Sequence, residues 1–418
     1  MIGLGGIAAL LGIAFGVSVD RRRALNPRIL AWGLGLQIGI ALFALRTRVG
    51  QRLFMAANDL ANDFLSFVDA GIRFVFGDWP SFTLVQTPAP GGGVKTVAVG
   101  FVLAVKVLPV IIFMASLMAV LYHIGIMQRV VALLARGLSR TMRVSGAEAL
   151  STVGDIFLGM TEAPLLIRPY VAGMTESELF AVMCAGMATI AGSVFLAYVA
   201  MGVNAGYLVT ASFMSAPAAV MFAKIMVPET GQPETAGADA RVDVAKLDVN
   251  LIDAAARGAS EGLQLALNVG GMLIAFVALV SMVDRGVGWV GGLAGHPELT
   301  LGRVLGAPLT PLAYLMGVPW REAPLVGQLL GTKTVLNEFI AYQAMTSHAA
   351  ELSPKSIRIT SFALCGFANF GSLAVVLGGL GGMVPERRKD LARLGLKSIL
   401  AGSLATFLTG TIAGMIGP

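Results

Sequence analysis

Long apolar runs, each about the length of a membrane span, recur through the whole chain. Clear examples are Val97–Tyr122, Leu179–Met201, Leu208–Met226 and Leu394–Ile416. Since about 20 apolar residues in a helix cross the hydrocarbon core of a bilayer, each run predicts one transmembrane helix. Only 13% of the 418 residues are charged, against roughly 25% in a soluble domain, and the mean hydropathy is +0.79. The pattern predicts an all-α polytopic membrane protein and excludes a disordered chain or a secreted disulfide scaffold.

The basic residues gather in short clusters beside the apolar runs. Arg21–Arg23 follows the first run, and Arg387–Lys389 separates the last two. Because basic residues concentrate on the cytoplasmic side, these clusters predict a multi-pass protein of the inner (plasma) membrane with both termini in the periplasm. No basic cluster precedes the first run, so we expect a true span there and not a signal peptide. The net charge of +6 then lies at the lipid surface, and no nucleic-acid partner is expected.

Two apolar segments, Val144–Tyr170 and Trp320–Gln343, are interrupted by glycine and proline and carry carboxylates in their middle. Each is too broken to cross the membrane as one helix. Each therefore predicts a re-entrant helical hairpin, which enters and leaves on the same side.

The remaining chain predicts scaffold and connections. We expect an amphipathic interfacial helix over Arg48–Phe76, an extended loop over Gly77–Val94, a cytoplasmic loop over Pro228–Arg257, and further spans at Leu263–Val283 and Leu301–Val318. About eight transmembrane helices plus two hairpins result. They divide into scaffold spans with the interfacial helix (1–126), a first transport repeat with the cytoplasmic loop (127–257), a scaffold span and connection (258–318), and a second transport repeat (319–418).

The two hairpins begin a weak internal repeat. Each is followed by a capped helix and then by a glycine-rich break inside an apolar run, Cys184–Ser193 in the first copy and Cys365–Ser372 in the second. Thr175 with Glu178 three residues later forms a capping box that starts the first of these helices. Paired interrupted segments in corresponding halves indicate a transporter with inverted repeats and a binding site near the membrane midplane.

Each repeat embeds one glutamate, Glu162 or Glu338. An unpaired carboxylate is costly in an apolar interior, so each needs a partner, a proton or a ligand. With the hydroxyl and amide groups at the breaks, the carboxylates could bind an uncharged polyol or heterocycle. In the structural alternative, Glu162 pairs with Arg168 and Glu338 with Lys333. An enzyme is not expected, since no nucleophile–base pair or metal cluster is found and no cofactor is implied.

Three stretches closely resemble the signature motifs of the concentrative nucleoside transporter family, bacterial type. They are GMTEAPLLIRPY over Gly159–Tyr170, GTK with LNEFIAY over Gly331–Tyr342, and CGFANFGS over Cys365–Ser372. The resemblance runs from about Val97 to the C-terminus. It implies a secondary active transporter that carries nucleosides into the cell with a cation. It also implies a homotrimer in which the transport repeats move, elevator-like, by alternating access.

The resemblance also implies site residues. Thr161 and Glu162, after Met160, would bind the base, with Val194 nearby. The ribose would contact Glu338, Asn369 and Ser372, and Phe367 and Leu265 would line the pocket. A coupling sodium ion would be held by Asp155, Thr161, Thr189 and the backbone of Leu158 and Ile190.

Two residues depart from the family pattern. Met160 stands where the family usually has Gln, which changes the hydrogen bonding available to the base. Asp155 stands where sodium-coupled members usually have Asn, and a carboxylate can bind Na⁺ or carry a proton. The coupling cation therefore stays open between Na⁺ and H⁺. A permease of the same fold for modified nucleosides or related heterocycles, and an uncoupled facilitator, are the alternatives.

Overall fold

The computed structural model describes residues 2–77, 84–88, 94–98, 102–237, 248–293, 295–296 and 298–417. Within these residues the regular secondary structure is helical apart from one small sheet. Strands β1 (Leu84–Pro88) and β2 (Val94–Ala98) pair antiparallel, with Gln86 opposite Thr96. Part of the segment predicted as an extended loop is thus a two-stranded ribbon; the rest of that segment, from 78 to 83 and from 89 to 93, lies outside the described residues.

The N-terminal third follows the predicted order of elements. Its helices are α1 (Ile2–Gly16), α2 (Arg21–Ala24), α3 (Pro27–Arg46), α4 (Arg48–Phe76), α5 (Leu103–Lys106), α6 (Leu108–His123) and α7 (Ile126–Met142). The predicted bounds of the amphipathic helix α4 are confirmed. The span expected from Val97 is wrong at its start. Val97 belongs to β2, and the helix begins at Leu103 and breaks at Val107, just before Pro109. Proline lacks the amide that would continue the helical hydrogen bonding.

Each of the two repeats contains a hairpin, a broken helix and a long final helix, in that order. The first contains α8 (Gly146–Gly154), the short 3₁₀ helix η2 (Ala163–Ile167), α9 (Arg168–Val171), α10 (Glu176–Ala188), α11 (Gly192–Ala200) and α12 (Ala205–Met226). The second contains α16 (Ala323–Val335), α17 (Glu338–Ser347), η4 (Ala349–Glu351), α18 (Pro354–Leu364), α19 (Phe370–Met383), η5 (Pro385–Arg387) and α20 (Arg388–Ile416). Both predicted hairpins are present, as α8 with η2 and α9 and as α16 with α17, and both predicted breaks occur.

The connection between the repeats differs from the prediction in two places. Helix α13 extends over Leu251–Leu293, so it includes the end of the expected loop; Asn250 caps its first turn by accepting from the amides of Ile252 and Asp253. The span expected at Leu301–Val318 is wrong. That segment forms α14 (Leu301–Gly306), η3 (Ala307–Leu309) and α15 (Thr310–Leu315), because Pro308 and Pro311 interrupt the helical hydrogen bonds.

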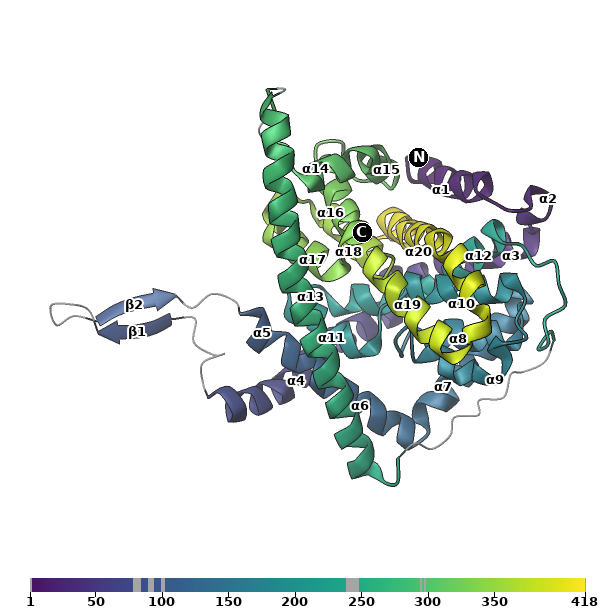
Figure 1. The fold of residues 1–418 in the computed structure, drawn as a ribbon, viewed down its shortest axis with the longest axis horizontal. Coiled ribbons are helices and arrows are strands. Elements are labelled where there is room, and N and C mark those ends of the chain that lie inside the picture. Colours follow the sequence, from purple (N-terminus) through teal and green to yellow (C-terminus); the bar gives the residue numbers. More distant parts are fainter. Residues whose placement is uncertain are drawn as a thin grey trace.

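Six helical segments among the described residues are long and apolar enough to cross a membrane, and α1 and α19 are shorter apolar helices. The six differ sharply in burial. In the segments Glu176–Ala200, Ala205–Met226 and Pro385–Ile416, 83–89% of the most apolar window is buried. The buried share of that window is only 17–28% for Pro27–Arg46, Leu103–His123 and Leu251–Leu293. The repeats therefore form a packed centre, and Figure 1 shows α13 as a long rod along one side of it.

Candidate functional site

The two helix breaks cross and touch at the centre of the repeats. The amide of Phe367, in the break between α18 and α19, donates to the carbonyl of Thr189, in the break between α10 and α11 (3.2 Å). A Cβ on Gly366 would lie 2.9 Å from the backbone of Ala188. Only glycine permits this approach. The backbone groups released by one break are thus partly satisfied by the other, which meets the requirement for unwound chain inside a membrane.

Glu338 lies at the start of α17 and is only 3% exposed. Its Oε1 accepts from the Tyr198 hydroxyl (2.9 Å) and its Oε2 from the Asn369 side-chain amide (3.1 Å). Asn369 also caps α19 by accepting from the Ser372 amide (2.7 Å). Three residues predicted to contact ribose are therefore joined in one hydrogen-bonded network.

The alternative ion pair between Glu338 and Lys333 is wrong. Among the described residues, the Lys333 amino group donates to the Ala363 carbonyl and to Thr406 Oγ1 instead, at 2.8 Å each.

Glu162 and its neighbours form the bend of the first hairpin. The Glu162 side chain is exposed, and its Oε2 accepts from the Gly159 amide (3.3 Å) rather than forming the alternative pair with Arg168. It lies within electrostatic range of Arg257 and Glu261 on α13. Thr161 packs against α19, 2.9 Å from the position of a Cβ on Gly379. The first hairpin therefore contacts the second half of the broken helix of the other repeat.

The other predicted substrate residues are distributed over several helices. Met160 packs against Gly186 of α10, with its Cβ 2.8 Å from a Cβ position there. Val194 is buried on α11, Phe367 is buried in the second break, and Leu265 is half-buried on α13 against the main core.

Asp155 lies directly after α8 and is only 1% exposed. Neither of its carboxylate oxygens has a hydrogen-bond partner among the described residues. Its Oδ1 lies 3.8 Å from a Cβ position on Gly186, and so faces the last turn of α10, just before Thr189 and Ile190. Thr189 donates its hydroxyl to Ala185, and Leu158 is half-buried in the hairpin bend. A buried carboxylate without donors is costly, and oxygen-binding cations such as Na⁺ relieve that cost.

Two tyrosines contribute that sequence reasoning missed. Tyr198 binds Glu338, and its ring packs 4.9 Å from the ring of Tyr342. The Tyr122 hydroxyl on α6 is buried without a partner among the described residues, and it lies within electrostatic range of Asp155 and Glu162. From the sequence these aromatics were interpreted as interface residues, and no local pattern links them to the embedded carboxylates.

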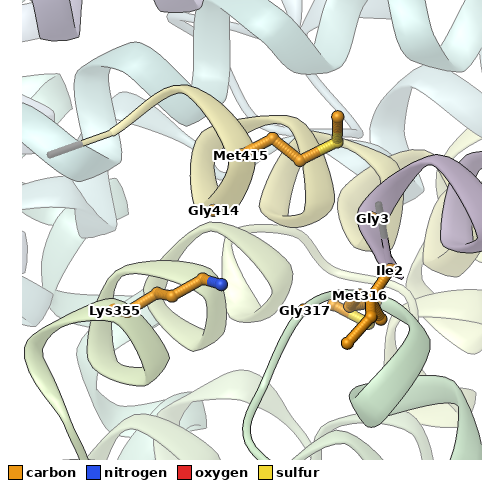
Figure 2. Close-up of a pocket in the computed structure, with 7 residues that line it drawn as sticks. All are labelled: Ile2, Gly3, Met316, Gly317, Lys355, Gly414 and Met415. Carbon is orange, nitrogen blue, oxygen red and sulfur yellow. The ribbon is translucent and has the colours of Figure 1, made fainter.

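Among the residues that the structure describes, an open cavity lies away from these side chains. It has a volume of about 320 Å³ and is bounded by α1, α15, α18 and α20; Lys355, Met316 and Met415 are among its lining residues (Figure 2). Apart from Lys355, its lining residues are apolar or are glycines, and none of the embedded carboxylates lines it. It does not have the convergent polar groups that a nucleoside needs.

The sequence and structure were compared with known proteins. Residues 5–79 and 207–414 match the N-terminus and C-terminus of the family described as "Na+ dependent nucleoside transporter", and residues 104–205 match "Nucleoside recognition". The chain is 44% identical over 413 residues to the uncharacterized transporter YutK of Bacillus subtilis (99% and 98% of the two chains). It is 41% identical over 415 residues to the nucleoside permease NupC of Helicobacter pylori (98% and 96%).

Solved structures agree with this assignment. CNTnw in an inward-facing, substrate-bound state superposes with a TM-score of 0.90 at 44% identity, covering 100% of this chain and 98% of that one. A variant of CNTnw in an outward-facing state gives 0.89 at 44% identity, covering 99% and 97%. The predicted fold class and family are confirmed. The chain belongs to the Na⁺-dependent nucleoside transporter family, whose members are transporters and not enzymes.

Proposed function

We propose that this chain carries nucleosides across the membrane by alternating access, with the ribose bound at Glu338, Asn369 and Ser372. The observation that carries the proposal is the buried network at the crossing of the two breaks. The network places a carboxylate and an amide next to each other, and these two groups can form hydrogen bonds with sugar hydroxyls. The base would contact Met160, Thr161 and Glu162, with Val194, Phe367 and Leu265 around the substrate.

Counterflow of radiolabelled uridine in proteoliposomes tests this proposal. Glu338→Gln and Asn369→Ala should each weaken uridine binding by about 1.5–3 kcal/mol, the range for a hydrogen bond to a charged group. Glu322→Gln is the matched control, because Glu322 accepts from Ser353 at the base of the same hairpin. Uracil that competes as strongly as uridine would contradict ribose recognition. Competition by modified nucleosides alone would favour the alternative substrate class.

The coupling cation is proposed to be sodium, bound beside Asp155 with Thr161, Thr189 and the backbone of Leu158 and Ile190. The family description supports sodium, and the buried Asp155 carboxylate without donors supports a cation at this point. Uptake should then require Na⁺ at every pH, and Asp155→Asn should weaken Na⁺ affinity. Asp253→Asn, on the exposed start of α13, is the control. Uptake that continues without Na⁺ and rises as pH falls would assign coupling to H⁺; indifference to both gradients would leave an uncoupled facilitator.

Assembly and placement complete the proposal. We expect a homotrimer in the inner membrane with both termini periplasmic, in which segments 1–126 and 258–318 form the scaffold while 127–257 and 319–418 move. The low burial of α13 supports a scaffold role, since its apolar side chains need lipid or another protomer. Multi-angle light scattering in detergent should give three chains per particle; one chain per particle would contradict the trimer.

A further inference from the structure

Lys333 is a buried basic residue whose hydrogen bonds, within the described part of the chain, do not include the Glu338 network. It lies in the last turn of α16, at the tip of the second hairpin, and is 0% exposed. Its amino group donates to the carbonyl of Ala363 on α18 and to Thr406 Oγ1 on α20. It also lies 5.8 Å from the centre of the Phe407 ring. These contacts join the hairpin tip to two other helices of the second repeat.

The position of Lys333 resembles that of Asp155. Asp155 directly follows the first arm of its hairpin, Lys333 lies in the last turn of the first arm of its own, and both are almost completely buried. Each also faces the last turn of the helix that precedes the break in its own repeat. For Asp155 the contact is with Gly186 of α10, and for Lys333 it is with Ala363 of α18. The two repeats therefore place groups of opposite charge near the ends of their first hairpin arms.

The electrostatics of helix ends explain why the sign of the charge at these two positions matters. The last carbonyl groups of a helix lack intrahelical donors, and they carry the negative end of the helix dipole. In the second repeat, the Lys333 amino group satisfies one of these carbonyls. In the first repeat, the Asp155 carboxylate adds negative charge at the same kind of position, so this end needs a positive charge from elsewhere.

We propose that Lys333 is a positioning residue that acts as a covalently attached counterpart of the coupling cation. Its amino group holds the tip of the second hairpin against the broken helix, so that the second repeat closes without taking an ion from solution. The comparison between repeats rests on the proposed cation site at Asp155. The role of Lys333 itself rests on its own contacts.

The labelling rate of a native cysteine measures whether the second hairpin is held against the broken helix. Cys365 follows α18 directly, is 0% exposed, and becomes the only cysteine in a Cys184→Ala background. The rate at which a maleimide labels Cys365 in the purified full-length protein should be equally slow in sodium chloride and in choline chloride. Lys333→Met keeps the bulk but removes the charge. It should label roughly tenfold to a hundredfold faster, the range for loss of a hydrogen bond to a charged group. Lys355→Met, at the cavity of Figure 2, should label like the parent.

A rescue experiment separates charge from packing. In Lys333→Ala, ethylammonium chloride should slow the labelling of Cys365, whereas an equal concentration of choline chloride should not. The proposal is overturned if Lys333→Met keeps the parental rate, or if ethylammonium gives no slowing. It is also overturned if the parent labels at least tenfold faster without sodium, a measurement that stands even if the variants do not fold. Failure of the Asp155 site would appear differently, as sodium-independent uptake with Cys365 protection intact.

Discussion

Removal of the Tyr198 hydroxyl tests the Glu338 network most directly. Tyr198 is fully buried on α11, and its hydroxyl donates to Glu338 Oε1 at 2.9 Å. Tyr198→Phe deletes one oxygen and keeps the ring packing against Tyr342 and Phe339. Glu338 then retains the Asn369 amide as its partner on Oε2, while Oε1 loses its donor in a water-poor interior.

The expected size of the effect follows from this geometry. A hydrogen bond to a charged group contributes about 1.5–3 kcal/mol, and burial of both partners removes the screening that would weaken it. If the tyrosine orients Glu338 for the sugar, the Kd for uridine should rise between about tenfold and about a hundredfold. Isothermal titration calorimetry on the purified protein measures this change.

The chain contains a matched control for this substitution. Tyr342 is equally buried and its ring lies 4.9 Å from that of Tyr198, but its hydroxyl donates to the Ser361 carbonyl (2.8 Å). Tyr342→Phe should lower the melting temperature without a comparable loss of uridine affinity. Equal losses of affinity in the two variants, or an unchanged Kd in Tyr198→Phe, would refute the argument that Tyr198 acts through Glu338.

Two further predictions concern the base pocket and the crossing of the breaks. Met160→Gln should change the ranking among pyrimidine and purine nucleosides in competition assays more than it changes total uptake, since an amide replaces a weakly accepting thioether; an unchanged ranking would mean that residue 160 does not contact the base. Gly366→Ala should lower the free energy of unfolding by about 1–3 kcal/mol, because its Cβ would lie 2.8 Å from Thr406 Cγ2 and 2.9 Å from the Ala188 backbone. Gly378→Ala, with no atom within 4 Å of its Cβ, is the control, and equal melting temperatures for both variants would contradict the close crossing.

Local sequence patterns were sufficient for much of the fold. Helix α4 begins and ends at the residues where the amphipathic pattern does, and the Thr175–Glu178 capping box starts α10 as expected. Both hairpins and both breaks also occur where glycine, proline and embedded carboxylates interrupt the apolar runs. These features depend on residues within a few turns of one another, so they can be read from spacing alone. The span expected at Leu301–Val318 is wrong because Pro308 and Pro311 divide an otherwise apolar segment into three short helices.

Long-range packing determined the rest. Tyr198 and Glu338 are 140 residues apart, and Lys333 and Thr406 are 73 apart. No periodicity relates such residues, so the sequence could identify Glu338 as a carboxylate that needs a partner but not Tyr198 as that partner. The sequence likewise offered Lys333 as the partner of Glu338, whereas the packing of α16 against α18 places Lys333 against the end of α18. A buried polar group binds whichever donor or acceptor the packed helices bring within reach, and that choice is made only when helices distant in the sequence pack together.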